Sequence, residues 1–319
     1  MSASTKSDNQ TAAVTLDKAD LENFPVAPAF LPAAWRGDLM AVYGFARLID
    51  DAGDGDLADP ASVAQLLDVP GAPEDEGFRL ALLDGLEQDL DRAFATALGD
   101  DRAQGGTVLG TAAGEPRHPL VRRLVPLIER HAVTPEPFRR LIEANRVDQA
   151  VTRYPTWDDL RHYCTLSADP VGRLVLALAG RATPARIGMS DDICTALQIV
   201  EHLQDVAEDL DRGRIYLPQE DLATFGVTEQ DLVAPAASRE VRQLIAWEAS
   251  RARTLLDRGA PLVGTVHGRL RLLLAGFTAG GYAALDAIAA AGYDVLAHRA
   301  KPDKRRLAGR AAALFAKGR

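Results

Sequence analysis

Residues 43–54 of the chain read YGFARLIDDAGD, and their spacing indicates the local structure. At 3.6 residues per turn of an α-helix, Asp50 and Asp54 share one helix face with Tyr43 and Arg47. The large apolar residues in and beside this stretch fall on the opposite face: Val42, Phe45, Leu48 and Ile49. We therefore expect an amphipathic helix that packs its apolar face into a core and carries carboxylates on its polar face.

A second stretch, residues 198–209 with the sequence QIVEHLQDVAED, repeats this spacing. The residues at the matching offsets are Gln198, His202, Asp205 and Asp209, with Glu201 and Glu208 to one side. Carboxylates one helical turn apart repel each other, so an isolated helix gains nothing from them. A divalent cation removes that penalty, and Mg²⁺ prefers carboxylate, water and phosphate oxygens. Two such helices are therefore suited to binding Mg²⁺ together with a diphosphate.

Arginines near both stretches fit the same hypothesis. Arg47, and with it Arg212 and Arg214, can donate hydrogen bonds to phosphate oxygens. The metal ions would act as a Lewis acid and template for the departing diphosphate. The alternative is that both stretches are ordinary solvent-exposed acidic helix faces. For His202 alone, a place in a polar pocket wall or as a hydrogen-bonded core histidine is favoured over metal ligation. The matching spacing of the two stretches favours the metal site.

The rest of the chain shows helical periodicity in long stretches rich in Ala, Leu, Arg and Glu, and strand patterns are scarce. The expected helices cover residues 32–50, 75–98, 119–131, 135–151, 156–180, 190–211, 238–259 and 265–297. Residues 99–117 have the composition of a surface loop. We expect one large all-α domain over residues 20–298, after a disordered lead at 1–19 and before a basic C-terminal tail at 299–319.

Composition and charge restrict the classes of function. The 319 residues include 36 Lys and Arg against 45 Asp and Glu, a formal net charge of −9 that disfavours nucleic acid as a partner. Two cysteines, Cys164 and Cys194, are too few for a disulfide framework. No secretion signal is apparent, and the longest uncharged run, Leu272 to Leu285, is shorter than the roughly 18–20 residues that span a bilayer. We expect a cytoplasmic enzyme, at most peripheral to the inner face of the membrane.

The C-terminal stretch differs from the rest in charge. Residues 299–319 contain eight Lys or Arg and a single acidic residue, Asp303. On a helix, the apolar residues of this stretch would share one face: Leu307, Ala311, Leu314 and Phe315. Two interpretations stay open: a basic amphipathic helix that rests on an anionic membrane surface, and a solvated tail.

Several short motifs resemble the squalene and phytoene synthase family. DDAGD at 50–54 and DVAED at 205–209 are similar to the two Asp-rich motifs of that family. Arg-Tyr at 153–154 and YCTLSADPVG at 163–172 resemble its central helix motif, and GRIYLP at 213–218 resembles the segment after its second acidic motif. The resemblance implies the all-α isoprenoid synthase helical bundle, with a central cavity in which Mg²⁺ holds a diphosphate.

The resemblance also implies roles for individual residues. The metal-binding carboxylates would be Asp50, Asp54, Asp205 and Asp209. Tyr163 corresponds to a tyrosine that assists proton movement near the leaving diphosphate, and Tyr43 to a pocket tyrosine, so these two are the catalytic candidates. The substrate-binding candidates are Arg47, Gln198, Glu201, His202, Arg214, Asp51 and Tyr282. Glu201 stands where the family usually has Asn, and Tyr282 offers an aromatic face that can stabilise a carbocation.

Two stretches suggest a branch within the family. ENFPVA at 22–27 and SADPVG at 167–172 are similar to the hopanoid-pathway hydroxysqualene synthases. That branch implies Mg²⁺-dependent conversion of presqualene diphosphate to hydroxysqualene, with release of diphosphate. The alternative within the family is head-to-head condensation of two farnesyl diphosphates to presqualene diphosphate, squalene or a carotenoid precursor. A catalytically silent helical binding protein is a third interpretation, which the complete set of four carboxylates disfavours.

Overall fold

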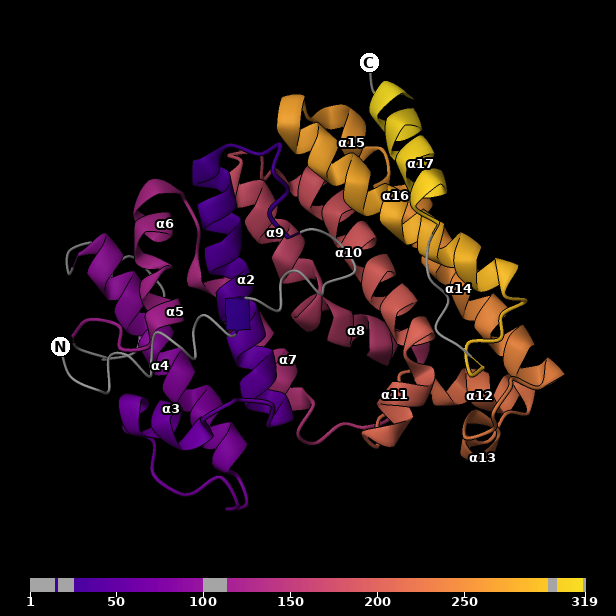
Figure 1. Ribbon diagram of the computed structural model, residues 1–319, viewed down its shortest axis with the longest axis horizontal. Helices are drawn as coiled ribbons and strands as arrows, with labels where there is room; N and C mark the ends of the chain where they lie inside the picture. The colour runs from indigo at the N-terminus through magenta and orange to yellow at the C-terminus, as the bar shows by residue number, and fades with distance from the viewer. Residues whose placement is uncertain (1–14, 17–25, 100–113, 298–302, 318–319) are drawn as a thin grey trace. The chain divides into compact units, whose positions relative to one another are not determined.

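The computed structural model describes residues 15–16, 26–99, 114–297 and 303–317. The chain forms two compact units, Met1–Ala150 (unit 1) and Val151–Arg319 (unit 2), which are coloured along the chain in Figure 1. The expected domain over 20–298 includes parts of both units. Each unit is helical, as an all-α fold predicts. The described residues contain one isolated β-bridge, between Arg153 and Ile215, and no β-strand.

Unit 1 contains six described helices. They are α2 (Ala33–Asp54), α3 (Pro60–Leu67), α4 (Phe78–Leu98), α5 (Pro119–Arg122), α6 (Val125–Arg130) and α7 (Pro135–Val147). The predicted apolar face of α2 is buried as expected, with Phe45 and Ile49 fully inside. Phe45 meets Phe138 of α7 edge to face, with ring centroids 5.4 Å apart, and this contact packs the two helices against each other.

Unit 2 contains ten described helices. They are α8 (Trp157–Ser167), α9 (Asp169–Leu178), α10 (Pro184–Gln204), α11 (Val206–Asp211), α12 (Gln219–Phe225), α13 (Glu229–Leu232), α14 (Arg239–Gly259), α15 (Leu262–Thr265), α16 (Gly268–Ala290) and α17 (Lys304–Lys317). Helices α9 and α14 both pack on α10, and α17 runs along α16 (Figure 1). The core of this unit is therefore built around α10, at whose C-terminal end the second acidic motif begins.

Several predicted helix boundaries were wrong. The helix expected over 156–180 is divided at Ala168, because Pro170 lies in the first turn of α9 and cannot continue the preceding helix. The helix expected over 190–211 begins earlier, at Pro184, and is interrupted at Asp205, whose backbone (φ −111°, ψ 15°) is not helical. The short helices α3, α12 and α13 were not expected.

Two expected segments lie largely outside the described residues. Most of the predicted loop at 99–117 falls in the gap at 100–113. Most of the predicted lead at 1–19 also lies outside the described residues. Its two described residues, Thr15 and Leu16, are helical, and Thr15 is buried.

Helix α16 is long and apolar enough to cross a membrane by length and composition, and it is the one described helix with that property. It lies inside unit 2 instead of presenting a continuous apolar surface, since 67% of its most apolar window is buried. Its glycines and alanines suit such close packing, because small side chains let neighbouring helices approach.

The C-terminal stretch forms α17, which docks on α16. Its four predicted face residues are all half-buried there: Leu307, Ala311, Leu314 and Phe315. Arg271 of α16 donates a hydrogen bond to the Phe315 carbonyl near the end of α17, and its guanidinium lies 4.9 Å from the centre of the Phe315 ring. Arg310 forms an ion pair with Asp286 at 2.8 Å. The apolar face of α17 is thus directed at α16.

Candidate active site

The first acidic motif lies on the last two turns of α2 in unit 1. Asp50 is solvent-exposed and Asp54 half-exposed, so both present oxygens on one side of the helix, as the spacing predicts. Asn145 of α7 donates a hydrogen bond from Nδ2 to Asp50 Oδ1 at 2.9 Å. The Asp50 carboxylate is therefore accessible to a ligand and oriented by a neighbouring helix.

Arg47 and Asp51 form an ion pair within α2. The Arg47 Nε atom lies 2.9 Å from Asp51 Oδ1, one turn along the helix, and Asp51 is buried. Asp51, a predicted substrate-binding residue, is thus buried and paired with Arg47 on its own helix, and its contact with substrate stays a prediction. The Arg47 side chain keeps 32% of its surface exposed, which leaves the guanidinium able to meet an anion.

The electrostatic environment of Asp50 is unusual for an accessible carboxylate. The protein atoms around it limit its solvation and raise its pKa to about 7, and Asp54 and Asp51 act in the same direction. The hydrogen bond from Asn145 and the charge of Arg47 lower the pKa, but by less. A cation beside Asp50 would relieve this unfavourable charge, because it stabilises the ionised carboxylate.

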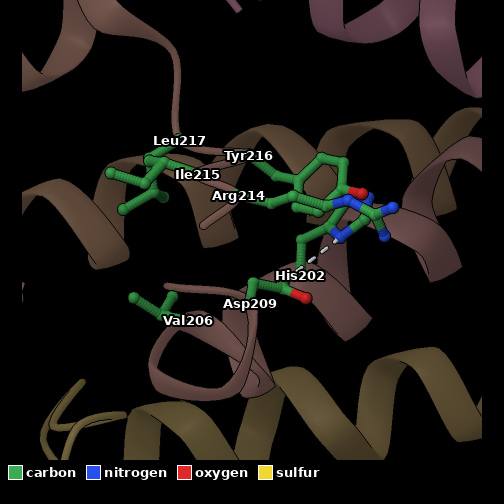
Figure 2. A pocket seen from close by; sticks show the side chains of 7 residues that line it. All are labelled: His202, Val206, Asp209, Arg214, Ile215, Tyr216 and Leu217. Atoms are coloured by element: carbon green, nitrogen blue, oxygen red, sulfur yellow. Dashed lines mark ion pairs between the residues drawn. The ribbon is translucent and has the colours of Figure 1, made fainter. Parts of the chain in front are cut away.

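The second acidic motif lies in unit 2, where α10 ends and α11 begins. Gln198 and His202 join their side chains on α10, with 3.2 Å between Gln198 Nε2 and His202 Nε2. The other imidazole nitrogen, Nδ1, lies 3.7 Å from Asp209 Oδ2 (Figure 2). Glu201 is exposed and Asp205 half-exposed on the same segment. The spacing correctly groups Gln198, His202 and Asp209, even though the helix breaks between them.

Three tyrosine rings cluster around the imidazole of His202 in the second motif. Tyr216 stacks on His202 with ring centroids 3.7 Å apart and an interplanar angle of 11°. Tyr154 stacks on Tyr216 in turn, at 5.7 Å and 21°. Tyr163 of α8 contacts all three rings, and its own ring centroid lies 6.4 Å from that of His202. The catalytic candidate Tyr163 is thus part of an aromatic cluster that includes the second acidic motif.

Backbone pairing places these rings. Ile215 donates its N–H to the Thr152 carbonyl at 3.0 Å, and Gln219 donates to the Tyr154 carbonyl at 2.9 Å. Arg153 adds a hydrogen bond to the Gly213 carbonyl at 2.7 Å. The segment before α8 and the segment after α11 therefore run side by side, which brings Tyr154 and Tyr216 together.

A small recess opens beside this cluster, and Figure 2 shows the side chains around it. Its lining residues are His202, Val206, Asp209, Arg214, Ile215, Tyr216 and Leu217. Asp209 and Arg214 are charged, whereas Ile215 and Leu217 are apolar, so one recess combines a polar end with an apolar wall. The recess has a volume of about 10 Å³, room for about one water molecule, so it marks where polar and apolar side chains meet and does not by itself hold a larger ligand.

The structure divides the predicted site residues between the units. Tyr43, Arg47, Asp50, Asp51 and Asp54 lie in unit 1, and Tyr43 is half-buried on α2. The others lie in unit 2: Tyr163, Gln198, Glu201, His202, Asp205, Asp209, Arg214 and Tyr282. In the described parts of the chain no group of three or more His, Cys, Asp or Glu side chains forms a metal site. Each unit contains two of the four predicted metal-binding carboxylates, and carboxylate oxygens are donors that fit Mg²⁺.

Tyr282 lies in a different environment from the other candidates in unit 2. Its hydroxyl donates to Asp257 Oδ1 at 2.5 Å, and the guanidinium groups of Arg253 and Arg310 lie 5.7 and 4.8 Å from the centre of its ring. Burial, reinforced by the hydrogen bond to Asp257, raises the pKa of Tyr282 above its ordinary value. These contacts join residues of α14, α16 and α17 around the ring, and the predicted role of Tyr282 in substrate binding stays a prediction.

Sequence reasoning missed three residues of these sites. Asn145 carries no motif of its own, and the sequence around it gives no signal for its contact with Asp50. Tyr154 and Tyr216 both lie inside segments that resemble the family, in Arg-Tyr-Pro and Arg-Ile-Tyr-Leu-Pro. The pairing of those two segments would have indicated that their tyrosines meet.

Comparison with known proteins identifies the family. The chain matches the squalene/phytoene synthase family model over residues 18–306. It is 31% identical over 272 residues to hydroxysqualene synthase from Zymomonas mobilis, covering 84% of this chain and 79% of the relative. It is 34% identical over 252 residues to hydroxysqualene synthase from Sinorhizobium fredii, covering 78% and 73%.

A solved structure agrees with the sequence matches. The crystal structure of squalene synthase HpnC from Alicyclobacillus acidocaldarius matches with a TM-score of 0.70 and 39% identity, covering 90% of this chain and 96% of that chain. Its helical fold confirms the predicted isoprenoid synthase architecture. The chain, with its two acidic motifs and its aromatic cluster, therefore belongs to the squalene/phytoene synthase family.

Proposed function

We propose that this protein is a Mg²⁺-dependent hydroxysqualene synthase, which converts presqualene diphosphate to hydroxysqualene and releases diphosphate. The observation that carries the proposal is the arrangement of side chains at the second acidic motif, where Asp209 and Arg214 lie beside the ring of Tyr216, which stacks on His202. An isoprenoid diphosphate needs polar groups for its head and an apolar, π-rich wall for the carbocation that its departure leaves. The names of the two bacterial relatives support this branch of the family.

The reaction balances without a reductant. The carbon–oxygen bond of presqualene diphosphate breaks, and diphosphate leaves with the electron pair. The cyclopropylcarbinyl cation rearranges, water adds to it, and the added water loses a proton. The products are hydroxysqualene and diphosphate, so the protein must bind the anion, shield the cation and admit one water molecule.

Individual residues have distinct tasks in this proposal. Arg47 and Arg214 donate hydrogen bonds to diphosphate oxygens, and the pairing of Arg47 with Asp51 fixes the direction of its guanidinium. Tyr163 and Tyr43 are the catalytic candidates, with Tyr163 close to the leaving group and its ring in the aromatic cluster. Asp50, Asp54, Asp205 and Asp209 would hold Mg²⁺, and Gln198, Glu201 and His202 would line the binding site. When bound, magnesium would stabilise the negative charge of the departing diphosphate.

A second candidate is the condensation of two farnesyl diphosphates to presqualene diphosphate, squalene or a carotenoid precursor. The solved structure from Alicyclobacillus acidocaldarius, which is 39% identical, bears the name squalene synthase and favours it. A catalytically silent binding protein is disfavoured, because all four principal carboxylates are retained.

Product analysis decides between these candidates. Purified protein is incubated with Mg²⁺ and either presqualene diphosphate or farnesyl diphosphate, and the lipid products and released diphosphate are measured. We expect hydroxysqualene from presqualene diphosphate; a C30 hydrocarbon from farnesyl diphosphate alone would overturn this choice. Asp50→Asn and Asp205→Asn should each abolish diphosphate release while the helical content is retained, and unchanged activity in both would contradict the metal assignment.

We also propose that the protein is cytoplasmic and contacts the inner face of the membrane through α17, since its C30 product is insoluble in water. Arg305 and Arg306 are exposed on this helix and can meet anionic lipid head groups while its apolar face packs on α16. Full-length protein should bind anionic liposomes more strongly than protein that lacks residues 299–319. Equal binding by both forms would defeat this part of the proposal.

A further inference from the structure

Asn145 of α7 contacts the first acidic motif through both ends of its side-chain amide. Its Nδ2 atom donates to Asp50 Oδ1 at 2.9 Å, and also lies 3.2 Å from the Leu141 carbonyl of its own helix. Its Oδ1 atom lies against Gly53, where an added Cβ would approach it to 2.3 Å. Asn145 is 7% exposed, so water competes little for its hydrogen bonds.

Gln149, which follows the C-terminal end of α7, also forms a hydrogen bond with α2. Its Nε2 atom donates to the Gly53 carbonyl at 2.9 Å and to the Asn145 carbonyl at 3.0 Å. Both acceptors are backbone carbonyls, whereas Asn145 donates to the side-chain carboxylate of Asp50. Both amides therefore form hydrogen bonds between α2 and the α7 segment, and the bond from Asn145 also orients the Asp50 side chain.

A neutral donor has a specific advantage at this position. A free aspartate side chain has several rotamers, and holding one of them lowers the entropy that a ligand must overcome. A lysine or arginine in place of Asn145 would also hold the carboxylate, but its charge would compete with an incoming cation. The amide fixes one oxygen of Asp50 and leaves the negative charge for that cation.

We propose that Asn145 is a positioning residue that holds the Asp50 carboxylate ready for a metal–diphosphate ligand, and that Gly53 is required to admit it. The inference rests on the proposed function, because it assumes that Asp50 meets a metal ion. It goes beyond the acidic motif itself, since Asn145 lies 95 residues away in sequence on another helix. Neighbours that orient a metal-binding carboxylate typically change metal affinity or activity by about 10–100-fold when they are replaced.

The test measures ligand binding apart from turnover. Full-length protein is titrated with MgCl₂ at a fixed concentration of inorganic pyrophosphate, and binding is followed by calorimetry and by the rise in melting temperature. The variants are Asn145→Leu, which keeps the side-chain volume, and Asn145→Ala, which cannot overpack the contact with Gly53. The matched control is Gln149→Met, which removes an α7–α2 hydrogen bond but leaves the Asn145–Asp50 bond in place.

We expect the Asn145 variants to need about 10–100-fold more Mg²⁺ for half-saturation. Gln149→Met should lower the ligand-free melting temperature and keep a wild-type Mg²⁺ requirement. A folded Asn145 variant with a wild-type Mg²⁺ requirement overturns the inference, as does an equal rise in Gln149→Met, which would indicate a purely structural contact.

The same titration separates this inference from the proposed function. If wild-type protein shows no Mg²⁺-dependent binding of pyrophosphate, the proposed diphosphate site itself fails. If wild-type protein binds but turns over neither isoprenoid diphosphate, the reaction assigned above fails and the role of Asn145 is still measured. Because one variant keeps the volume of the site and the other reduces it, a packing defect peculiar to one of them does not decide the result.

Discussion

The ring of Tyr216 lies flat on the imidazole of His202, with centroids 3.7 Å apart and an interplanar angle of 11°. His202 belongs to α10, whereas Tyr216 comes from the segment after α11, so the stack joins the second acidic motif to the segment that follows it. It fixes the plane of an imidazole whose two nitrogens face Gln198 and Asp209. Tyr216 therefore stabilises the arrangement of the motif as well as lining the recess.

Substitutions at Tyr216 test the stack. Tyr216→Phe keeps the aromatic face and should retain most of the activity. Tyr216→Ala removes a ring contact worth about 0.5–1.5 kcal/mol, and kcat/KM for the isoprenoid diphosphate should fall by about 3–10-fold or more. Steady-state kinetics of both variants provide the measurement. If Tyr216→Phe is as impaired as Tyr216→Ala, the hydroxyl and not the stack is the important group.

Gly172 tests the packing of α9 on α10. An added Cβ there would lie 2.3 Å from Ser190 Oγ and 2.6 Å from Cys194 Sγ, so Gly172→Ala should overpack the contact and destabilise the protein by about 1–3 kcal/mol. The matched control is Gly188→Ala, also on a helix, where an added Cβ meets nothing within 4 Å. It should be neutral or stabilising by about 0.5–1 kcal/mol, because alanine favours the helix. Urea unfolding of both variants measures the difference.

The sequence predicted the parts of the fold that depend on local periodicity. The apolar face of α2, with Phe45 buried and Asp50 exposed, follows from spacing within a single helix. The break at Ala168 also has a local signal, because Pro170 is typical of the first turn of a new helix. The break at Asp205 has none, because its residues fit a continuous helix as well as an interrupted one.

The contacts that complete each motif are long-range and could not be read from spacing. Asn145 reaches Asp50 across 95 residues, and the stack of Tyr216 on His202 depends on a loop that returns to its own helix. Tyr282 is a substrate-binding candidate for its aromatic face alone, and the sequence did not indicate that two arginines and Asp257 surround it. The neighbours of a side chain depend on tertiary packing, which one sequence does not specify residue by residue.

Glu248 on α14 gives the protein a pH-dependent stability. Its side chain is buried beside Asp221 and Arg251, with 3.0 Å between Glu248 Oε1 and a guanidinium nitrogen of Arg251. Burial raises the pKa of Glu248 from 4.5 to about 8, although the charge of Arg251 acts in the opposite direction. A carboxyl group whose pKa is higher in the folded state stabilises the fold most below its unfolded pKa, and that contribution is lost as the pH rises through about 8.

Glu248→Gln should therefore flatten the dependence of stability on pH. The amide is close in size to the protonated carboxyl group and does not ionise, so the variant should lose less stability than wild type between about pH 6 and pH 9. Denaturant midpoints measured across this range check the expectation. A wild type whose stability falls no more steeply than that of the variant would contradict the assignment.

Phe315 tests the docking of α17. Its half-buried ring contacts the Arg271 guanidinium at 4.9 Å, so Phe315→Ala should destabilise unit 2 by about 1–2 kcal/mol and lower its melting temperature. Arg306→Ala on the exposed side of the same helix should leave the melting temperature within the usual range for surface substitutions. Equal effects of both changes would mean that the packed face is not what holds α17.

The non-helical backbone of Asp205 matters to anyone who would redesign this enzyme. Placing residues 198–209 on a straight, uninterrupted helix would keep the sequence of the motif but change the direction of the Asp209 side chain relative to His202. A functional graft has to carry the hinge at Asp205 along with the returning loop that ends in Tyr216.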